Sequence, residues 1–333
     1  MTQEHPFAQY VRILGRGKTN SRSLKPDEAE QAMGMIVRDE VLPAQLGAFL
    51  MLLRLKEETA EEIAGFVRAV RASFPVPDAA TVDLDWSSYA GKRRQLPWFL
   101  LAAIVLARHG VRVFMHGAEG HTPGRLYTRA VLEALDLPVA RSLEEAADHV
   151  GRGNFVYLPL TALSPRLDEI IDMRPIFGLR SPVHTIARML NPFAAPCMMQ
   201  GIFHTGYMNI HQEAARLLGQ PHMAVFRGEG GEIERRPNKP CEVYTVHDGV
   251  AGTENWPKLL PDPRQQTDTA MEAGRLLSVW RGETEDAYAD AAVIGTLAIA
   301  LKLLGRAATM DEAQKTAETL WRERDRGRFL EVA

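Results

Sequence analysis

Residues 82–117 read VDLDWSSYAGKRRQLPWFLLAAIVLARHGVRVFMHG and place a helical segment between two short strand-like runs. The runs are Val82–Leu84 and Val111–Met115, and the helical segment is Leu96–Arg108. A helix that connects two short β-branched runs is typical of a parallel sheet. The apolar stretch 96–107 is about half of the ~20 residues that a membrane-spanning helix needs. We therefore interpret it as a buried helix of an α/β fold.

The same alternation continues toward the C-terminus. Further strands are expected at Phe155–Leu158, Met198–Phe203, Met223–Phe226 and Val243–Val246. Helices are expected at Pro123–Leu135, Leu143–Val150 and Asn209–Leu218 and, after a proline-containing loop at 255–263, at Gln265–Trp280, Ala287–Leu304 and Met310–Arg324. This order predicts an α/β domain over residues 76–333, with a mostly parallel central sheet covered on both faces.

The first 75 residues contain signals for helices only. Pro26 and Pro43 stand where proline is favoured, at the first position of a helix. Thr59 and Glu62 form a capping box for another helix. We predict a small helical domain over residues 1–75, with a later helical contribution near 175–195.

The helix that begins at Pro43 predicts self-association. Phe49, Leu50, Leu52 and Leu53 give it more apolar surface than one face can bury in so small a bundle. A homodimer through the N-terminal helices is therefore expected.

Composition excludes several classes of protein. The chain has 333 residues, of which 46% are hydrophobic and 24% charged, as in an ordinary globular protein. The net charge of −3 excludes a protein dominated by positive field. Two cysteines exclude a disulfide framework and a cysteine zinc cluster. With no apolar signal segment at the N-terminus, we expect a cytoplasmic protein with no membrane partner.

Charge is nevertheless segregated along the chain. The spans 12–25, 86–118 and 173–212 contain basic residues and no acid. If the three spans meet in the fold, they form a positive groove, and arginine is well suited to hold its phosphates. The alternative is that these charges are solvated or form structural ion pairs.

Several motifs resemble the anthranilate phosphoribosyltransferase family, which belongs to glycosyltransferase family 3 and has the nucleoside phosphorylase fold. These motifs, in an order and spacing that match across nearly the whole chain, are LKPDEA from Leu24, QLGAFLM from Gln45, RLKEETAEEIAG over 54–65, His116-Gly117, Met173-Arg174, Gly178-Leu179-Arg180 and Asn191-Pro192. The resemblance implies a helical domain joined to an α/β domain, and a homodimer through the helical domain. It also implies phosphoribosyl transfer from phosphoribosyl pyrophosphate (PRPP) to anthranilate with magnesium.

The chain departs from the family pattern at the PRPP and magnesium motifs. The family's Gly-Thr-Gly-Gly-Asp loop appears as SYAGKR over 88–93, where only Gly91 remains, and its Asn-x-Ser-Thr loop as LPWF over 96–99. Met115 replaces the lysine before His116, and Gly231-Glu232 replaces the Asp-Glu pair that holds magnesium. Glu232 alone is a weak remnant of a metal site, since magnesium needs several oxygen ligands. No cofactor is therefore expected, and magnesium only if the chain is a transferase.

The departures resemble a divergent branch of the family that is associated with nucleic-acid binding. That branch keeps a Gly15-Arg16-Gly17-Lys18 signature and a loop of the 89–93 type. The first hypothesis is therefore a protein that has lost PRPP chemistry and binds nucleic-acid phosphates, largely independently of sequence. The candidate phosphate-binding residues are Arg16, Lys18, Gly91, Lys92, Arg93, Arg94, His116, Gly117, Arg174 and Arg180.

Alternatives remain for the function and for single residues. DNA or RNA, single- or double-stranded, and another phosphate-bearing ligand all fit the basic spans. The second hypothesis is a glycosyltransferase that transfers a phosphoribosyl or pentosyl group to an unidentified acceptor. Arg174 aligns with the family arginine that meets the anthranilate carboxylate, but it could instead form a structural ion pair. Arg180 could also pair with an acid. His116 could support a turn instead of binding a ligand.

Overall fold

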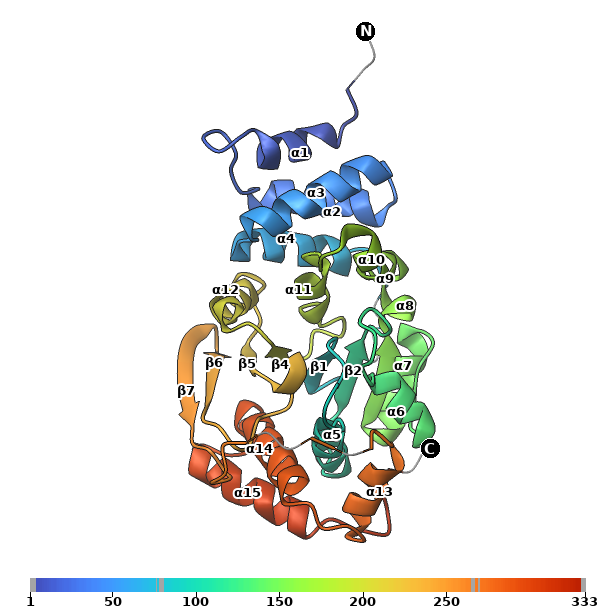
Figure 1. Cartoon of the computed structure of the whole chain (residues 1–333), viewed down its shortest axis with the longest axis vertical. Helices are drawn as coiled ribbons and strands as arrows, with labels where there is room; N and C mark the ends of the chain where they lie inside the picture. The colour runs from blue at the N-terminus through green and yellow to red at the C-terminus, as the bar shows by residue number, and fades with distance from the viewer. Residues whose placement is uncertain (1–3, 76, 78–80, 265–266, 269, 331–333) are drawn as a thin grey trace.

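A helical domain stands above the end of a twisted sheet (Figure 1). The computed structural model describes residues 4–75, 77, 81–264, 267–268 and 270–330. The helical end comprises α1 (Ala8–Gly15), α2 (Pro26–Val37), α3 (Pro43–Lys56) and α4 (Ala60–Arg71). Of these, α4 lies nearest the sheet and α1 farthest from it (Figure 1).

The sheet has seven strands in the order β3-β2-β1-β4-β5-β6-β7. The strands β1 to β5 pair in parallel, whereas β6 and β7 form an antiparallel hairpin at one edge. In the centre, Leu84 of β1 is in register with Val113 of β2 and with Cys197 of β4. The strands are β1 (Leu84–Ser88), β2 (Val113–Gly117), β3 (Phe155–Pro159), β4 (Cys197–Ile202), β5 (His222–Arg227), β6 (Cys241–His247) and β7 (Val250–Trp256).

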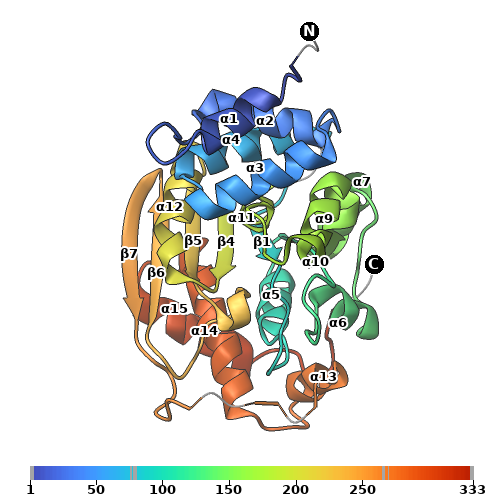
Figure 2. The ribbon, with the colours of Figure 1, turned by 45° about the horizontal axis from the view of Figure 1, so that its top comes forward.

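Helices cover both faces of the sheet. One face packs against α5 (Phe99–Arg108), α6 (Thr128–Ala134), α13 (Gly274–Arg281), α14 (Ala287–Leu303) and α15 (Met310–Arg322). The core of the other face is continuous with that of the helical domain through α7 (Leu143–Gly153), α8 (Leu160–Leu163), α9 (Pro165–Asp172), α11 (Val183–Arg188) and α12 (Met208–Leu217). The short helix α10 (Arg174–Phe177) follows α9. Figure 2 shows α11 and α12 between the helical end and the strands.

Local signals explain where the helices begin and how they pack. The side chain of Thr59 accepts a hydrogen bond from the Glu62 backbone, and Glu62 accepts one from the Thr59 backbone, so the capping box starts α4. A Cβ at Gly65 would lie 2.4 Å from the Pro26 carbonyl oxygen, so glycine lets α2 and α4 approach closely. The helix α5 is buried on all sides except its last residue, in keeping with its apolar sequence.

The prediction of a helical domain joined to a mostly parallel α/β domain is confirmed. The first predicted strand was placed too early, because β1 runs over Leu84–Ser88 and Val82 precedes it. Strand β7 was missed because its residues alternate poorly and are mostly exposed. The helices predicted from Pro123 and Gln265 begin only at Thr128 and Gly274, and Gln265 itself lies outside the described residues.

Three of the four apolar residues of α3 that predicted self-association pack within the chain. Phe49, Leu50 and Leu53 are at most 1% exposed, and Phe49 contacts the rings of Phe7 and Phe66 edge to face. These three residues are therefore used within the chain, whereas Leu52, the fourth residue behind the dimer prediction, is half-buried. An exposed apolar residue does remain near the end of α3, where Leu55 is 85% exposed.

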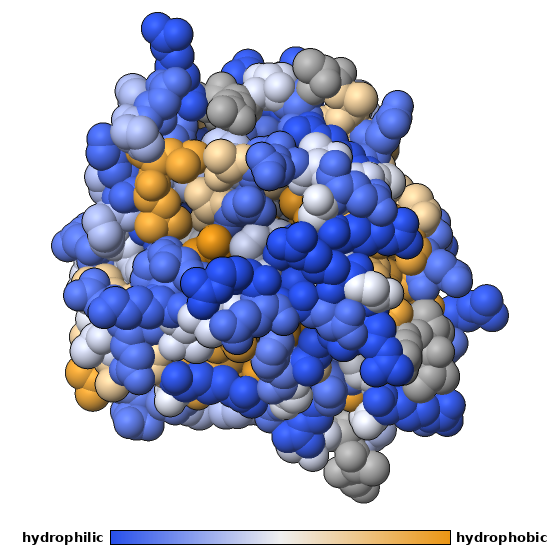
Figure 3. All heavy atoms as spheres, turned by 90° about the horizontal axis from the view of Figure 1, so that it is seen from below, coloured by the Kyte–Doolittle hydropathy of each residue, from blue (hydrophilic) through white to orange (hydrophobic). Residues whose placement is uncertain are grey.

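The end of the molecule opposite the helical domain is mainly hydrophilic, with small separate apolar patches (Figure 3). None of the helices in the described ranges is both long and apolar enough to cross a membrane.

Candidate functional site

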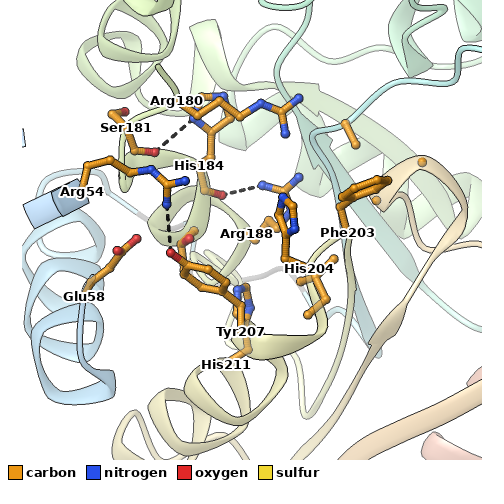
Figure 4. A pocket seen from close by; sticks show the side chains of 15 residues that line it. Arg54, Glu58, Arg180, Ser181, His184, Arg188, Phe203, His204, Tyr207 and His211 are labelled. Atoms are coloured by element: carbon orange, nitrogen blue, oxygen red, sulfur yellow. Dashed lines mark hydrogen bonds between the residues drawn. The ribbon is translucent and has the colours of Figure 1, made fainter. Parts of the chain in front are cut away.

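A cleft of about 120 Å³ lies where the helical domain meets the carboxyl ends of the parallel strands. Ligands of open α/β sheets bind at this edge. Figure 4 shows that charged, histidine and aromatic side chains surround the cleft. Its lining residues come from α3 and the turn after it, from the segment around α11, from the segment after β4 and from the loops at residues 90 and 230: Arg54, Glu58, Ala90, Arg180, Ser181, His184, Thr185, Arg188, Ile202, Phe203, His204, Tyr207, His211, Gly230 and Gly231.

The cationic side of the cleft is built around Arg180, just before α11. Arg174 and Arg180 both donate hydrogen bonds to the Thr122 hydroxyl, at 2.5 and 3.3 Å. Arg188 is 8% exposed and donates to the carbonyl oxygen of His184 at 2.6 Å. Burial lowers the pKa of Arg180 to about 10, and the charges of neighbouring arginines, including Arg188 and Arg174, contribute to this shift. Neither Arg174, Arg180 nor Arg188 forms a salt bridge with a described residue.

Three buried polar atoms of the cleft lining have no hydrogen-bond partner among the described residues: Glu58 Oε2, Ser181 Oγ and His184 Nε2. Their side chains are only 3–6% exposed, yet all three residues line the cleft. His184 Nδ1 donates to the Ser181 carbonyl, so in the neutral ring Nε2 is an acceptor. Burial keeps the pKa of His184 well below its usual value, and burial raises that of Glu58. Buried polar groups are normally hydrogen-bonded, so these atoms are available to a ligand.

Aromatic rings lie in the same cleft. Phe203 is 44% exposed, and the guanidinium of Arg227 lies 5.6 Å from the centre of its ring. Tyr207, in the 3-10 turn η1 (Thr205–Tyr207), accepts a hydrogen bond from Arg54 of α3 at 2.9 Å, which joins the two domains across the cleft (Figure 4). His204, between them, lies edge to face with Phe203.

The loop after β1 is closed by a carboxylate of this chain. Glu232 Oε1 accepts from the backbone N–H groups of Ala90 and Gly91, each at 2.6 Å, and Oε2 accepts from the Ser88 hydroxyl at 2.8 Å. Gly91 has φ +67°, a conformation that glycine adopts without strain. Gly91 therefore shapes an anion-binding loop as the sequence indicated, but the anion in it is Glu232.

The structure separates Lys92, Arg93 and Arg94, three consecutive residues that were all expected to bind phosphate. Lys92 is 1% exposed, and its Nζ lies 2.5 Å from Glu234 Oε1, so the expectation that it reaches a ligand from an open loop is wrong. Burial raises the pKa of Glu234 to about 7, an effect that Lys92 partly offsets. Arg93 and Arg94 are exposed but do not line the cleft.

His116 and Gly117 lie inside the protein. His116 is fully buried, with Nδ1 2.7 Å from the Tyr89 hydroxyl and Nε2 3.4 Å from Asp85. A Cβ at Gly117 would lie 1.9 Å from the Ser88 carbonyl oxygen, so glycine is needed for packing. Both residues support the loops, and the expectation that they bind phosphate is wrong, because neither lines the cleft and His116 is fully buried.

Arg16 and Lys18 are exposed in the loop that follows α1. That helix lies on the far side of the helical domain from the sheet (Figure 1), and neither residue lines the cleft. The three basic spans therefore do not meet in one groove.

Glu232 does not fit a magnesium site. Both of its oxygens already accept hydrogen bonds from loop 88–91, and Gly231 supplies no carboxylate. Within the described ranges, no group of three or more histidine, cysteine, aspartate or glutamate side chains could hold a metal ion. As folded here, Glu232 therefore has no carboxylate oxygen that is free of a hydrogen bond within the chain.

Of the ten candidate residues, only Arg180 lines the cleft directly, and Arg174 joins it through Thr122. Sequence reasoning did not select Glu58, Ser181, Phe203 or Tyr207, because nothing in a local pattern distinguishes them from surface or core residues. The acid-free span 173–212 was the useful signal, since it supplies Arg180 and most of the other lining residues.

Comparisons with known proteins agree with this architecture. Residues 8–74 match the helical bundle domain of the glycosyl transferase family. An anthranilate phosphoribosyltransferase of Moorella thermoacetica is 30% identical over 315 residues, which cover 89% of each chain. An uncharacterized protein of Escherichia coli K12 is 25% identical over 287 residues, or 82% of this chain and 88% of that one.

Solved structures share the fold. Anthranilate phosphoribosyltransferase from Thermus thermophilus superposes with a TM-score of 0.80 at 21% identity, covering 96% of this chain and 94% of that one. The enzyme from Saccharomyces cerevisiae, in complex with PRPP and Mg, gives a TM-score of 0.77 at 15% identity with the same coverage.

Proposed function

The chain belongs to the anthranilate phosphoribosyltransferase family, and from this premise we propose that it uses the family's interdomain cleft to bind nucleic-acid phosphates without a metal ion. The observation that carries the proposal is the setting of Arg180, whose guanidinium donates to the same Thr122 hydroxyl as that of Arg174. Its charge is partly buried, its neighbours are other arginines, and none of the described carboxylates forms a salt bridge with it. A cation in such a position is stabilised by an anion from outside, and the planar guanidinium fork matches phosphate.

Aromatic rings beside the arginines favour a nucleic-acid strand over free phosphate. Phe203 exposes nearly half of its surface, and His204 and Tyr207 follow it in the same lining. Proteins that bind single strands combine basic grooves with rings on which unpaired bases stack. Glu58 Oε2 and His184 Nε2 add two acceptors without partners, which suit the N–H groups on the edge of a base. A single strand is therefore the preferred ligand.

Magnesium chemistry is not part of this proposal. The yeast relative binds Mg and PRPP, but the carboxylate at position 232 here faces loop 88–91, and both of its oxygens are engaged there. Binding should therefore proceed equally well in a chelating buffer.

Fluorescence anisotropy with a labelled single-stranded oligonucleotide tests the proposal. We expect affinity that falls steeply between about 50 and 200 mM salt and is the same with EDTA or magnesium. Arg180→Ala should weaken binding about tenfold and lower the log–log salt slope by about 0.7, the value for one phosphate contact on a single strand. Arg93→Ala, which removes an exposed arginine outside the cleft, serves as the matched control. No binding by wild type, or equal loss in both variants, would contradict the proposal.

A second candidate function is glycosyl transfer, and the relatives favour it. The 30% identity to an anthranilate phosphoribosyltransferase extends over 89% of the chain. Incubating the protein with PRPP, magnesium and anthranilate and measuring released pyrophosphate tests this candidate directly. Turnover above a protein-free control would replace the binding proposal by the transferase one.

A homodimer through the helical domain remains a prediction. Exposed apolar residues support it, since Leu55 near the end of α3 and Ile176 on α10 are 85% and 81% exposed. Light scattering at micromolar concentration should give twice the chain mass of 37.0 kDa.

A further inference from the structure

We propose that Glu232 is an internal anion that occupies the phosphate-binding loop after β1 and thereby excludes terminal diphosphates from the cleft. Two consecutive backbone N–H groups and a hydroxyl converge on its carboxylate at 2.6–2.8 Å. Converging backbone N–H groups of this kind form an anion-binding concavity. Because Glu232 is 1% exposed, the anion is held inside the protein.

Four glycines allow the backbone to bring the Glu232 carboxylate to this loop. A Cβ at Gly228 would lie 1.6 Å from the Glu232 carbonyl oxygen, and one at Gly201 of β4 would lie 2.3 Å from the same atom. Gly230 and Gly231 both have positive φ, at +68° and +96°, so the chain turns sharply just before Glu232. Side chains at these positions would displace the backbone that carries the carboxylate.

Further contacts hold the two loops together. Arg125 donates from Nη1 to the carbonyl oxygens of Ala90 and Gly91 on one loop, at 2.8 and 3.3 Å, and of Gly230 on the other, at 3.4 Å. The buried Lys92–Glu234 pair joins the same loops one step farther along. Glu232 therefore cannot leave the N–H groups without disturbing several buried contacts, and an incoming anion has to compete with all of them.

This arrangement discriminates between two kinds of phosphate. A terminal diphosphate carries several charges on adjacent groups, and at this loop it would meet a carboxylate whose donors are already engaged. A phosphodiester carries one charge and can bind at Arg180, outside the closed loop. The inference rests on the proposed function, which assigns the ligand's phosphates to Arg180. It adds that Glu232 is the residue that makes the cleft bind phosphodiesters in preference to diphosphates.

Calorimetric titration with inorganic pyrophosphate, without metal, tests the proposal. Glu232→Ala leaves two buried N–H donors without an acceptor and should bind pyrophosphate at least about tenfold tighter than wild type. Glu232→Gln keeps an oxygen for these donors and so protects the fold, while removing the charge, and should bind about threefold tighter. Glu119→Ala, which removes a carboxylate from the loop after β2 at the same edge of the sheet, controls for the change in net charge and should have a smaller effect.

Pyrophosphate affinity in both Glu232 variants no higher than in Glu119→Ala would overturn the proposal. If Glu232→Ala fails to fold, as judged by circular dichroism, Glu232→Gln alone decides the outcome. The same proteins are titrated with the oligonucleotide, because this separates the two claims. Wild type that binds no oligonucleotide contradicts the proposed function, whereas oligonucleotide binding with unchanged pyrophosphate affinity contradicts the role of Glu232 only.

Discussion

The loop at residues 88–92 and the arginine side of the cleft lie at the same edge of the sheet, but they differ in how their charged groups are paired. In the loop, the charged groups have partners within the chain: Glu232 has three donors, and Lys92 has Glu234. On the arginine side, the charges nearest Arg180 are mainly those of other arginines, and buried polar atoms of the same cleft lining have no partners among the described residues. Charges satisfied inside the protein stabilise its fold, whereas charges left without partners are available to a ligand.

Lys92 and Arg180 make the difference concrete. Both are basic residues in loops near the carboxyl ends of strands, and both were expected to bind phosphate. Lys92 is completely buried against a carboxylate, so its removal should affect stability and not binding. Arg180 is partly exposed in the cleft, so its removal should affect binding and not stability. Measuring both quantities for both residues tests the comparison.

The largest expected effect is on stability. Lys92→Ala leaves Glu234 buried without its partner and should lower the free energy of unfolding by about 3–5 kcal/mol, measured by denaturant titration. Because burial holds the pKa of Glu234 near 7, above its unfolded value, the folded carboxyl can take up a proton. Above this pH the buried carboxylate is charged and depends on Lys92. The stability loss caused by Lys92→Ala should therefore grow as the pH rises through neutrality. Arg94→Ala, an exposed control in the same loop, should change stability by less than about 0.5 kcal/mol.

A substitution that displaces the backbone of Glu232 should have the next largest effect on stability. In Gly228→Ala the new methyl group would overlap the Glu232 carbonyl oxygen, and we expect a stability loss of about 1–3 kcal/mol in the same titration. Gly206→Ala, on the cleft side, is the control, because a Cβ there meets no atom within 4 Å. Equal stability of the two variants would show that the loop is not tightly closed.

On the open side, Phe203→Ala should weaken oligonucleotide binding by about 1 kcal/mol, or roughly fivefold, through loss of base stacking. The salt slope of binding should not change, since no charge is removed. Leu217→Ala is a matched control, because Leu217 is also 44% exposed but lies outside the cleft lining. If anisotropy shows that Phe203→Ala binds the oligonucleotide as tightly as wild type, Phe203 is not part of the proposed site.

The smallest expected effect concerns His211, a buried histidine of the cleft lining. Burial lowers the pKa of His211 to about 3, so between this value and about 6.5 the unfolded chain binds a proton that the folded chain does not. The stability that comes from keeping His211 neutral in the folded state is therefore fully present above a pH of about 6.5, and it is lost as the pH falls below this value. This residue alone should contribute a loss of about 0.7 kcal/mol between about pH 7 and 6. His211→Gln should show a correspondingly shallower pH dependence in parallel denaturant titrations, and an unchanged slope would contradict the assignment.

The amino-acid sequence alone determined the architecture of this protein. The prolines at 26 and 43 and the Thr59–Glu62 capping box locate helix starts through contacts between residues close in sequence. The alternation of strands and helices after residue 82 predicts the parallel sheet, because periodicity is a local property of the chain. The acid-free span 173–212 also identified the segment that supplies most of the cleft.

Only the tertiary structure decided which basic residues remain available to a ligand. Glu232 meets Ser88 across 144 positions of sequence, and Glu234 meets Lys92 across 142. No local pattern encodes such pairings, because they depend on where the packing of β1, β4 and β5 brings their following loops. A lysine and an arginine of equal charge thus acquire opposite roles: burial against a carboxylate makes the first structural, and the lack of any such partner among the described residues leaves the second to bind an anion.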